Sequence, residues 1–440
     1  MRVLLINDST TNSNWGDRAA AISLMAMIDA SGGEVTHVVS EDNLRLSSFG
    51  DLPDQPDEIV RNRGREIAKL FIPPLILRIR RRILTNPDST HASRLIPDKW
   101  DDFDTAAAAA LREKRHGWPT LLGAIDDADV VVIHGDGAMV GNGVVPRTDL
   151  FLTYLVKKHV RKPVTIVNHS ADFDHPDLRW MAQEVYPLFD DVVFRDPLSA
   201  DRCKTMCAGR FAADTAFWFK PAPLDSWAPI ARRLTYFDIW PDTAPFDPSR
   251  PYLCIGGSSI QCTAWRPAEI TEDYVALVKH LQGVYGGQIV VTVSGLQELE
   301  VFRPLAARLG LPLIAPTIPV QQAVDILGHA DAYIGGRWHT AIFALRGGTP
   351  VVALSAKQAK MSSLMLAAGL PTTAFDAFDL ASNKVGIGRA LVDHLERGDS
   401  LRSELRKWAD RMAENSWDNV TYLTGYRQAR CPVGGKGLND

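Results

Sequence analysis

The residues best suited to chemistry in this sequence lie in one short segment, Gly335–Thr340, which reads GGRWHT. The segment follows a predicted strand at 332–334 and opens a predicted helix. Backbone N–H groups at a helix N-terminus form an anion site, and the planar guanidinium of Arg337 is suited to a carboxylate or a phosphate. His339 can donate a hydrogen bond or move a proton near neutral pH. The alternative is a glycine turn with a solvated arginine and a histidine that caps the helix. We favour the ligand site, because a bound anion would offset two cationic side chains at the positive end of a helix.

Two further polar segments follow predicted strands in the N-terminal half of the chain. After the first strand, Asn14 and Asp17 supply a donor and an acceptor, and Gly16 permits close approach of the backbone. Asp17 is equally suited to cap the next helix. Gly135 and Asp136 end a strongly apolar strand, where either a ligand site or a tight turn would use these residue types.

Other polar residues also come directly after predicted strands. His169 and Arg195 each end one, and Asp214 is either a further carboxylate of the same rim or the acceptor of a local turn. Lys357 and Lys360 follow the last predicted strand and could offer point charges to a phosphate, although exposed lysines usually have no such role. In a parallel sheet the carboxyl ends of the strands share one rim, so these side chains should face the same cleft as Arg337 and His339.

Strand and helix patterns alternate in both halves of the chain, which is typical of doubly wound α/β domains. We therefore predict an α/β fold of two Rossmann-like domains that face each other across a cleft. The expected parts are a first domain over 1–219 with an insertion at about 43–103, a proline-rich connector over 220–251, a second domain over 252–415, and a C-terminal helix and tail over 416–440. Strands are expected at 3–6, 35–40, 130–134, 164–168, 192–195, 252–255, 289–293, 312–314, 332–334 and 351–354.

Composition excludes several classes of protein. The chain has 48 Lys and Arg against 52 Asp and Glu, so its net charge of −4 does not favour nucleic acid as a partner. No run of about 18 apolar residues occurs, so no membrane-spanning helix is expected. The first apolar run is too short for a signal peptide. The five cysteines are scattered, and no second Cys or His pair at ligand spacing accompanies Cys203 and Cys207. This pattern favours a cytoplasmic protein without a metal site.

One basic segment, 61–84, leaves two interpretations open. Its first 22 residues, 61–82, hold eight Lys or Arg and one acid, interleaved with Leu and Ile. Such a stretch could lie on an anionic membrane surface, at the inner face of the membrane. We favour the other interpretation, a helix docked on the N-terminal domain with its arginines in water.

The sequence resembles the polysaccharide pyruvyl transferase family. The resemblance rests on the following segments, which occur in the family's order over residues 1–370: Asn14–Asp17 before an Ala-rich helix, His134–Gly137, Val193–Asp196 with Ser199, Asp214–Phe217, and Gly336–His339 through Gly348–Pro350 to Lys357 and Lys360. Arg18 stands where the family often has an acidic residue.

The resemblance implies a GT-B-like fold and the transfer of pyruvate from phosphoenolpyruvate to two hydroxyls of one sugar, which gives a cyclic ketal and phosphate. The acceptor would be a glycan of bacterial type, such as an exopolysaccharide unit or a lipid-linked oligosaccharide, and neither a cofactor nor a metal is expected. The resemblance places donor binding at Arg195, Gly336, Arg337, Trp338, His339 and Lys357, and His169 is a candidate second imidazole at the donor site. The resemblance places acceptor binding at Asn14, Gly16, Asp17, Gly135 and Asp136, with His339, Arg337, Asp17 and Asp136 as the candidate catalytic residues.

Two other functions use the same features. A GT-B glycosyltransferase could hold a nucleotide-activated sugar with an Arg/His phosphate clamp. A non-catalytic, glycan-binding homologue could keep the fold and the acceptor site without turnover.

Overall fold

The computed structural model describes residues 1–46, 49, 95–115, 117–233, 236, 244–314, 316–357 and 360–430. The basic segment 61–84 and most of the expected insertion at 43–103 lie outside these residues, so the two interpretations of that segment stay predictions. Within the described residues, no helix has the combination of length and apolar character that crossing a bilayer requires.

The chain forms two compact units, and neither is continuous in sequence. The first unit comprises Met1–Thr11, Ala21–Thr215 and the C-terminal residues from Trp417. The second unit comprises Asn12–Ala20 and Ala216–Ser416. The short segment Asn12–Ala20, which the sequence assigned to the N-terminal domain, therefore belongs with the C-terminal half of the chain.

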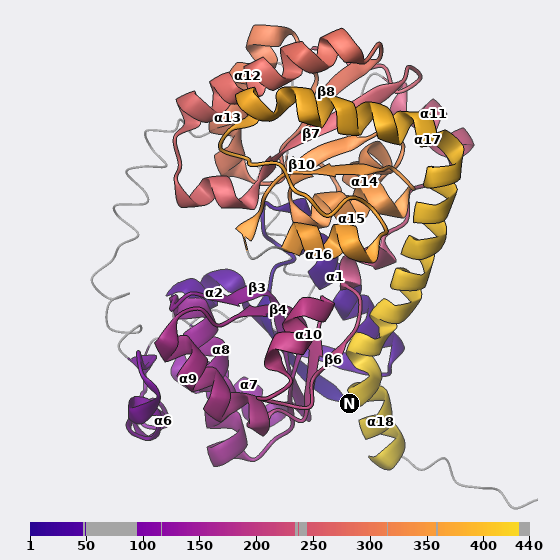
Figure 1. The fold of residues 1–440 in the computed structure, drawn as a ribbon. Helices are drawn as coiled ribbons and strands as arrows, with labels where there is room; N and C mark the ends of the chain where they lie inside the picture. Colours follow the sequence, from indigo (N-terminus) through magenta and orange to yellow (C-terminus); the bar gives the residue numbers. More distant parts are fainter. Residues whose placement is uncertain are drawn as a thin grey trace, which may run out of the picture. The chain divides into compact units, whose positions relative to one another are not determined.

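The described part of the first unit is built on a parallel sheet with the strand order β2-β1-β3-β4-β5-β6 (Figure 1). The strands are β1 (Arg2–Asp8), β2 (Glu34–Ser40), β3 (Val130–Val140), β4 (Val164–Asp172), β5 (Asp191–Phe194) and β6 (Arg210–Phe211). The sheet is apolar on both faces because alternate side chains of a strand point to opposite sides and helices cover each side.

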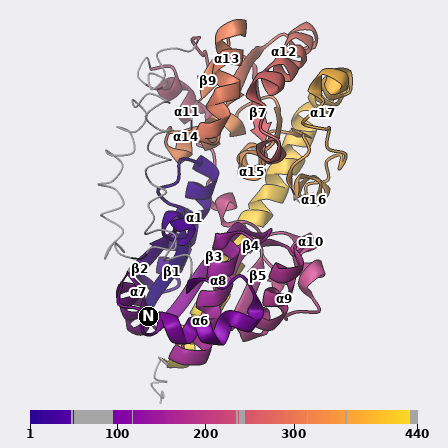
Figure 2. The same cartoon turned by 90° about the vertical axis from the view of Figure 1, so that its left-hand side faces the viewer.

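Alternate residues of β1 show the two faces of this sheet. Leu4 and Ile6 pack in one core with helices that include α8, and Figure 2 shows α6, α8 and α9 in front of the strands. Val3 and Leu5 pack in the other core with Leu24 of α1. The helices of the first unit are α2 (Glu41–Leu46), α6 (Phe103–Ala110), α7 (Trp118–Asp127), α8 (Val144–Leu155), α9 (Pro176–Val185), α10 (Pro197–Cys203) and α18 (Thr421–Arg430), together with α1 (Trp15–Ala30) from Ala21 onward.

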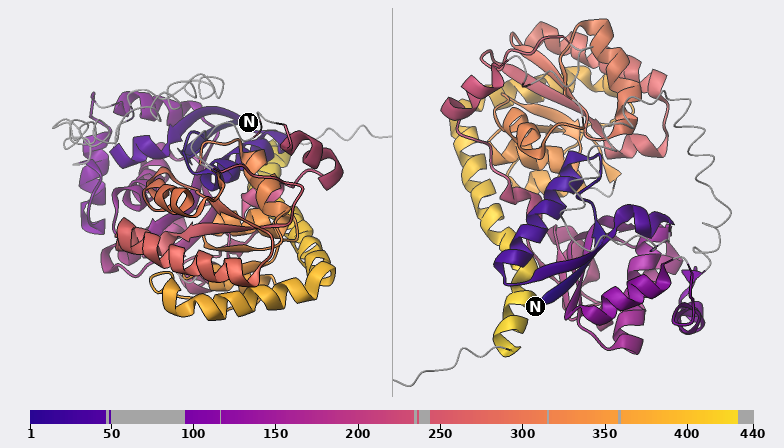
Figure 3. Two further views of the ribbon diagram at one scale, coloured as in Figure 1. Left: turned by 90° about the horizontal axis from the view of Figure 1, so that it is seen from above. Right: turned by 180° about the vertical axis from the view of Figure 1, so that it is seen from behind.

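The C-terminal residues return to the first unit. Val420 and Leu423 complete the core on the α1 face of the sheet. Figure 3 (right) shows the yellow C-terminal helix beside the indigo N-terminal segment. Buried Asn419 accepts a hydrogen bond from the Asn168 N–H at 2.9 Å and donates one to the Ala213 carbonyl at 3.0 Å. One amide side chain thus ties the end of the chain to two segments of the first unit.

The second unit contains a parallel sheet with the order β11-β10-β7-β8-β9. Its strands are β7 (Tyr252–Ser258), β8 (Gln288–Thr292), β9 (Leu313–Ile314), β10 (Tyr333–Gly336) and β11 (Val351–Ala353). Its helices are α11 (Leu224–Ala231), α12 (Pro267–Val284), α13 (Leu299–Leu309), α14 (Val320–Gly328), α15 (Trp338–Arg346), α16 (Lys360–Ala367) and α17 (Leu380–Asn415).

Helices α12, α13 and the first part of α17 cover one face of the second sheet, where their apolar side chains share a core with the strands. Gly398 interrupts α17 with φ 52° and ψ −135°, values outside the helical region that glycine tolerates best. Figure 1 shows the resulting bend in the yellow helix.

These sheets confirm the predicted α/β fold with two Rossmann-like units. The predicted connector 220–251 contains one short helix, α11, which forms between Pro223 and Arg232 and buries Trp227. The predicted ends of two strands were wrong. Strand β4 runs to Asp172 rather than ending at Asn168. Strand β3 runs to Val140 rather than ending at His134, because it stays paired with β4 as far as the Val140–Asp172 pair.

Candidate active site

In the second unit the GGRWHT segment lies where the sequence predicted it, with Arg337 between β10 and α15. The close packing of the strands explains the glycine before it. A Cβ on Gly336 would come within 2.5 Å of the Ser258 hydroxyl oxygen and 2.9 Å of the Ser355 carbonyl oxygen. Only glycine fits at this position at the end of β10. The end of β10 in turn sets the position of the Arg337 backbone, which follows directly.

The guanidinium of Arg337 is held by a carboxylate. Its Nε donates to Glu298 Oε1 at 2.8 Å, and its Nη2 lies 3.7 Å from the Cys262 sulfur. The Arg337 side chain keeps 20% of its surface exposed. Burial alone would lower the pKa of Arg337, but the Glu298 carboxylate outweighs burial and raises it, so the group stays cationic.

Glu298 is itself fixed at the end of η7 (Leu296–Glu298), directly before α13. Its Oε2 accepts from the Ser294 N–H at 2.9 Å, the Ser294 hydroxyl at 3.1 Å and the Gly295 N–H at 3.3 Å. A Cβ at Gly257 would overlap Oε1 of Glu298, so a glycine in β7 makes room for this carboxylate.

His339 in the first turn of α15 pairs with Asp17 in the first turn of α1, with 3.4 Å between Nδ1 and Oδ1. His339 is only 7% exposed. The contact depends on Gly16, since a Cβ there would overlap the Cβ of His339. Arg18 fastens the same turn to the second unit by donating to the carbonyls of Pro316 at 3.0 Å and Ile318 at 2.8 Å.

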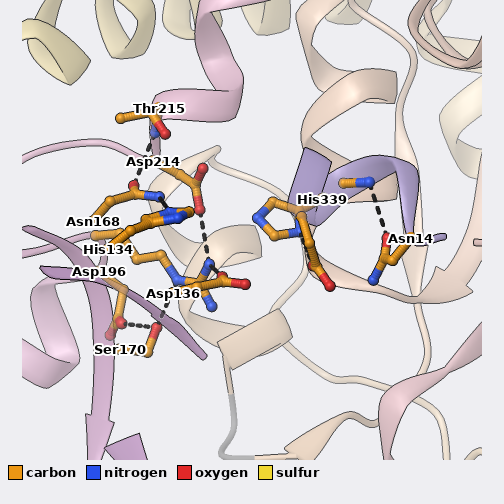
Figure 4. Close-up of polar contacts among 12 residues, drawn as sticks. Asn14, His134, Asp136, Asn168, Ser170, Asp196, Asp214, Thr215 and His339 are labelled. Carbon is orange, nitrogen blue, oxygen red and sulfur yellow. Dashed lines mark hydrogen bonds and ion pairs between the residues drawn. The ribbon is translucent and has the colours of Figure 1, made fainter. Parts of the chain in front are cut away.

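Asn14 shapes the turn that leads into α1. Its Oδ1 accepts from the Gly16 N–H at 2.9 Å, and its own N–H donates to Asn12 Oδ1 at 3.0 Å; Figure 4 shows Asn14 with its contacts and, in the same unit, His339. Asn12 Nδ2 also donates to Asp17 Oδ2 at 3.3 Å. The Asn14–Asp17 segment, which the sequence places in the N-terminal domain, thus lies in the same unit as the GGRWHT segment and contacts it.

A second cluster lies at the carboxyl edge of the sheet in the first unit. Arg195 forms ion pairs through Nη1 with Asp136 and, at 3.1 Å, with Asp214, and its Nε donates to the Ser170 hydroxyl at 3.0 Å. Asp214 is fully buried and the Arg195 side chain is 1% exposed, whereas the Asp136 side chain is 19% exposed. The two carboxylates raise the pKa of Arg195 against the opposing effect of burial. Among the three charged side chains of this cluster, Arg195, Asp136 and Asp214, Asp136 is thus the most exposed.

The backbone at this edge is unusual for residues with a side chain. Asn7, Asp136 and Asn168 have φ values of 65°, 41° and 53°, in the left-handed region that Asn and Asp tolerate better than most residues. Asn7 donates to the His134 carbonyl at 2.7 Å. Asn168 accepts from the Thr215 N–H at 2.9 Å, as Figure 4 shows. Such strain persists only where neighbours enforce it, and it is frequent at functional sites.

His169 lies within the first unit's interior. Its Nδ1 lies 2.9 Å from the Val193 carbonyl oxygen and its Nε2 lies 3.0 Å from the Tyr186 hydroxyl. Burial lowers the pKa of His169 to about 3, so the ring is neutral at neutral pH. Its neighbour Gly135 is required for packing, because a Cβ there would overlap the Cβ of His169. The observed contacts of His169 are those of a structural histidine, and its donor-binding role stays a prediction.

The remaining predicted site residues belong to the second unit. Trp338 is 5% exposed and starts α15. The Lys357 N–H donates to the Ser259 hydroxyl at 3.2 Å, which places its backbone beside η6 (Ser259–Thr263), the turn that carries Cys262.

Two residues of the second-unit cluster, Glu298 and Cys262, were not predicted from the sequence. The spacing Ser294-x-x-x-Glu298 before an amphipathic helix indicates a carboxylate that folds back onto nearby N–H groups, but nothing in the sequence connects it with an arginine 39 residues further on.

Chemically, the second-unit cluster offers a fixed guanidinium, an imidazole paired with a carboxylate, and a thiol. The first-unit cluster offers a partly exposed carboxylate on a buried arginine. These groups suit the binding of a small anion and the movement of protons.

Solved structures identify the class of fold. The chain is similar to Arabidopsis thaliana UGT89C1 complexed with UDP, at 15% identity and a TM-score of 0.53, with 97% of this chain and 99% of that chain covered. It is also similar to the spinosyn rhamnosyltransferase SpnG complexed with spinosyn aglycone (17% identity, TM-score 0.50, 96% and 100% covered) and to the S. aureus MnaA–UDP co-structure (12% identity, TM-score 0.50, 98% and 96% covered). At these identities the likeness concerns the fold alone, which is a GT-B-like pair of α/β units.

The family follows from the sequence. Residues 14–358 match the family of polysaccharide pyruvyl transferases, and the chain belongs to this family. No curated protein matches the chain. The matched region contains both clusters, from Asn14 to Lys357.

Proposed function

We propose that this transferase moves the pyruvyl group of phosphoenolpyruvate onto two hydroxyls of one sugar, forming a cyclic ketal and releasing phosphate. The observation that carries the proposal is the Arg337–His339–Asp17 cluster of the second unit, in a chain of the pyruvyl transferase family. A cation, a proton carrier and a carboxylate within one unit are the groups that an enol phosphate requires.

The proposed reaction forms two C–O bonds at one carbon, first by addition to the enol and then by displacement of phosphate. In the first step, a proton reaches the methylene carbon of the donor while a sugar hydroxyl oxygen bonds to C2 and loses its own proton. In the second step, a neighbouring hydroxyl bonds to C2, the C–O bond to phosphate breaks, and the hydroxyl proton is released. Arg337 would hold the anionic donor, and His339 would supply the proton while Asp17 orients its ring. Asp136, the partly exposed carboxylate of the first-unit cluster, is the proposed base for the acceptor hydroxyl.

The proposed acceptor is a glycan of bacterial type, either free or carried on a lipid. The family acts on polysaccharides, which supports a carbohydrate acceptor. The acceptor sugar is to be identified by assaying a panel of glycans that differ in the spacing and configuration of their hydroxyl pairs.

The proposal is tested by phosphate release from phosphoenolpyruvate in the presence of that glycan panel, together with thermal shifts for phosphoenolpyruvate and for nucleotide sugars. We expect phosphoenolpyruvate to raise the melting temperature and to be consumed only with an acceptor. In Arg337→Ala, the lost guanidinium should reduce kcat/KM by roughly 100-fold or more, the scale of losing a charged contact in a closed site.

Two results would contradict the proposal. Stabilisation by nucleotide sugars alone would favour the glycosyltransferase. Glycan binding without phosphate release, in wild type and Arg337→Ala alike, would favour a binding protein without catalysis.

A further inference from the structure

We propose that Glu298 is a positioning residue for Arg337 and that the donor anion binds to the terminal Nη1 and Nη2 atoms of Arg337, not to its Nε edge. This inference rests on the proposed function, since it concerns the same donor. It assigns a role to a buried carboxylate and predicts which edge of the guanidinium faces phosphoenolpyruvate.

The occupied edge of the guanidinium supports this orientation. An arginine can bind a carboxylate or phosphate with two parallel hydrogen bonds along its Nε–Nη edge or along its Nη1–Nη2 edge. Glu298 Oε1 takes the Nε–H at 2.8 Å. The one other hydrogen-bond contact that the described residues make with the guanidinium is the long 3.7 Å approach of Nη2 to the Cys262 sulfur, a weak acceptor. The Nη1–Nη2 edge is therefore the one that a strong anionic acceptor can take.

The rigidity of Glu298 explains why it orients rather than reacts. Its second oxygen accepts from the Ser294 N–H, the Ser294 hydroxyl and the Gly295 N–H, and the residue is 2% exposed. Gly257 of β7 keeps the backbone close against it. A carboxylate held by three donors on one oxygen and a guanidinium on the other cannot swing to meet a substrate.

Two substitutions test the charge of the Glu298 side chain and its length separately. Glu298→Gln keeps the chain length, but its amide cannot accept from both Arg337 and the Ser294–Gly295 donors. Glu298→Asp keeps the charge and withdraws the carboxylate by about 1.5 Å, one carbon–carbon bond. If Glu298 positions Arg337, both changes should raise KM for phosphoenolpyruvate by roughly 10- to 100-fold, the cost of a misplacement of about 1 Å. KM for the acceptor glycan should stay within about twofold in both variants, because only the donor contact moves.

A matched control separates positioning from a general loss of packing. Asp325 is another buried acid of the second unit, and its carboxylate accepts from the Ala222 N–H at 2.7 Å and from Gln321 at 2.9 Å. We expect Asp325→Asn to lower the melting temperature without changing KM for phosphoenolpyruvate. Glu298→Gln should instead change KM for phosphoenolpyruvate more than it changes the melting temperature.

The deciding experiment combines Glu298→Gln with Arg337→Lys in the full-length protein. Lysine has a single ammonium and no second edge to orient, so an effect of Glu298 that acts through Arg337 should disappear in that background. We expect the donor KM of the double variant to equal that of Arg337→Lys. Alkylation of Cys262 by iodoacetamide, followed by mass spectrometry, gives an independent readout. Phosphoenolpyruvate should protect this thiol in wild type and protect it less in Glu298→Gln.

The possible failures are distinguishable. If wild type neither binds nor consumes phosphoenolpyruvate, the proposed function and this inference fall together. Two outcomes with an active wild type overturn the positioning role alone. In the first, the effects of Glu298→Gln and Arg337→Lys on the donor KM add independently. In the second, Glu298→Gln raises the donor KM and the acceptor KM alike.

Discussion

Both arginines that the sequence suggested as donor clamps are held by acidic side chains in the folded protein. Arg337 pairs with Glu298, and Arg195 pairs with Asp136 and Asp214. A guanidinium removed from water needs such partners, because an unpaired buried charge is strongly destabilising. The two sites differ in what is left for a ligand: Arg337 keeps a fifth of its side chain exposed, whereas Arg195 is almost completely enclosed.

Asp149 of α8 provides a test at the same scale, away from the candidate site. It is fully buried, and among the described residues neither carboxylate oxygen has a hydrogen-bond partner. Burial, assisted by the charge of Glu41, raises its pKa well above the ordinary value of 3.8. The folded state therefore holds the proton to higher pH than the unfolded state does, and stability falls as pH rises from about 4 through the folded pKa.

Asp149→Asn removes this dependence. We compare the free energies of unfolding of the variant and wild type by urea denaturation at pH 4.5, 6.0 and 7.5. The difference should shift in favour of the variant as pH rises, by at most about 1.4 kcal/mol per pH unit. The exposed variant Asp101→Asn serves as control and should run parallel to wild type. Parallel curves for Asp149→Asn would show that this carboxyl does not titrate as described.

At the scale of elements, the local pattern of the sequence located the strands, and packing decided which helix ends meet. Apolar alternation and flanking glycines placed β1 and β10 to within about two residues. The contact of the first turn of α1 with α15 could not be predicted in this way, because it joins residues more than 300 positions apart. The sign of this contact in the sequence is Gly16 beside Asp17, because a glycine permits the close approach of another segment.

Gly16→Ala tests this contact between helices. The new methyl would overlap the Cβ of His339, which is fixed to the backbone of α15, so the turn must shift and the Asp17–His339 pair must lengthen. We expect kcat to fall by roughly 10- to 100-fold, with a stability loss of about 1–3 kcal/mol.

Gly283→Ala in α12 is the matched control, because a Cβ there meets no atom within 4 Å. It should leave kcat unchanged. Wild-type kcat in Gly16→Ala would show that the close approach of the two helices has no part in the reaction.

At the scale of the whole molecule, the chain passes between its two units more than once. Asn12–Ala20 belongs to the second unit, and the residues from Trp417 belong to the first. Each unit is therefore completed by a segment from the other end of the chain. Asn419 is the clearest single contact of the returning segment, since it satisfies two buried backbone groups of the first unit.

Asn419→Ala should therefore destabilise the first unit. Removing the side-chain oxygen and nitrogen that Asn419 offers to the Asn168 N–H and the Ala213 carbonyl is expected to cost about 2–4 kcal/mol in the free energy of unfolding. Denaturant titration followed by circular dichroism measures the loss. Gln428→Ala, an amide removed from an exposed position of α18, should change stability by no more than about 0.5 kcal/mol. An equal effect of both substitutions would mean that the buried contacts of Asn419 contribute nothing.

The sequence by itself determined the α/β class, the alternation of strands and helices in two halves, the family, and the segment that carries Arg337 and His339. These depend on apolar periodicity and on short motifs, which are local properties of the chain. Only the tertiary structure decided that Glu298 holds Arg337, that Asp17 faces His339, and that Arg195 is enclosed by two carboxylates. The choice of a charged partner depends on which strand ends lie side by side and on how far each is buried, and long-range packing sets both.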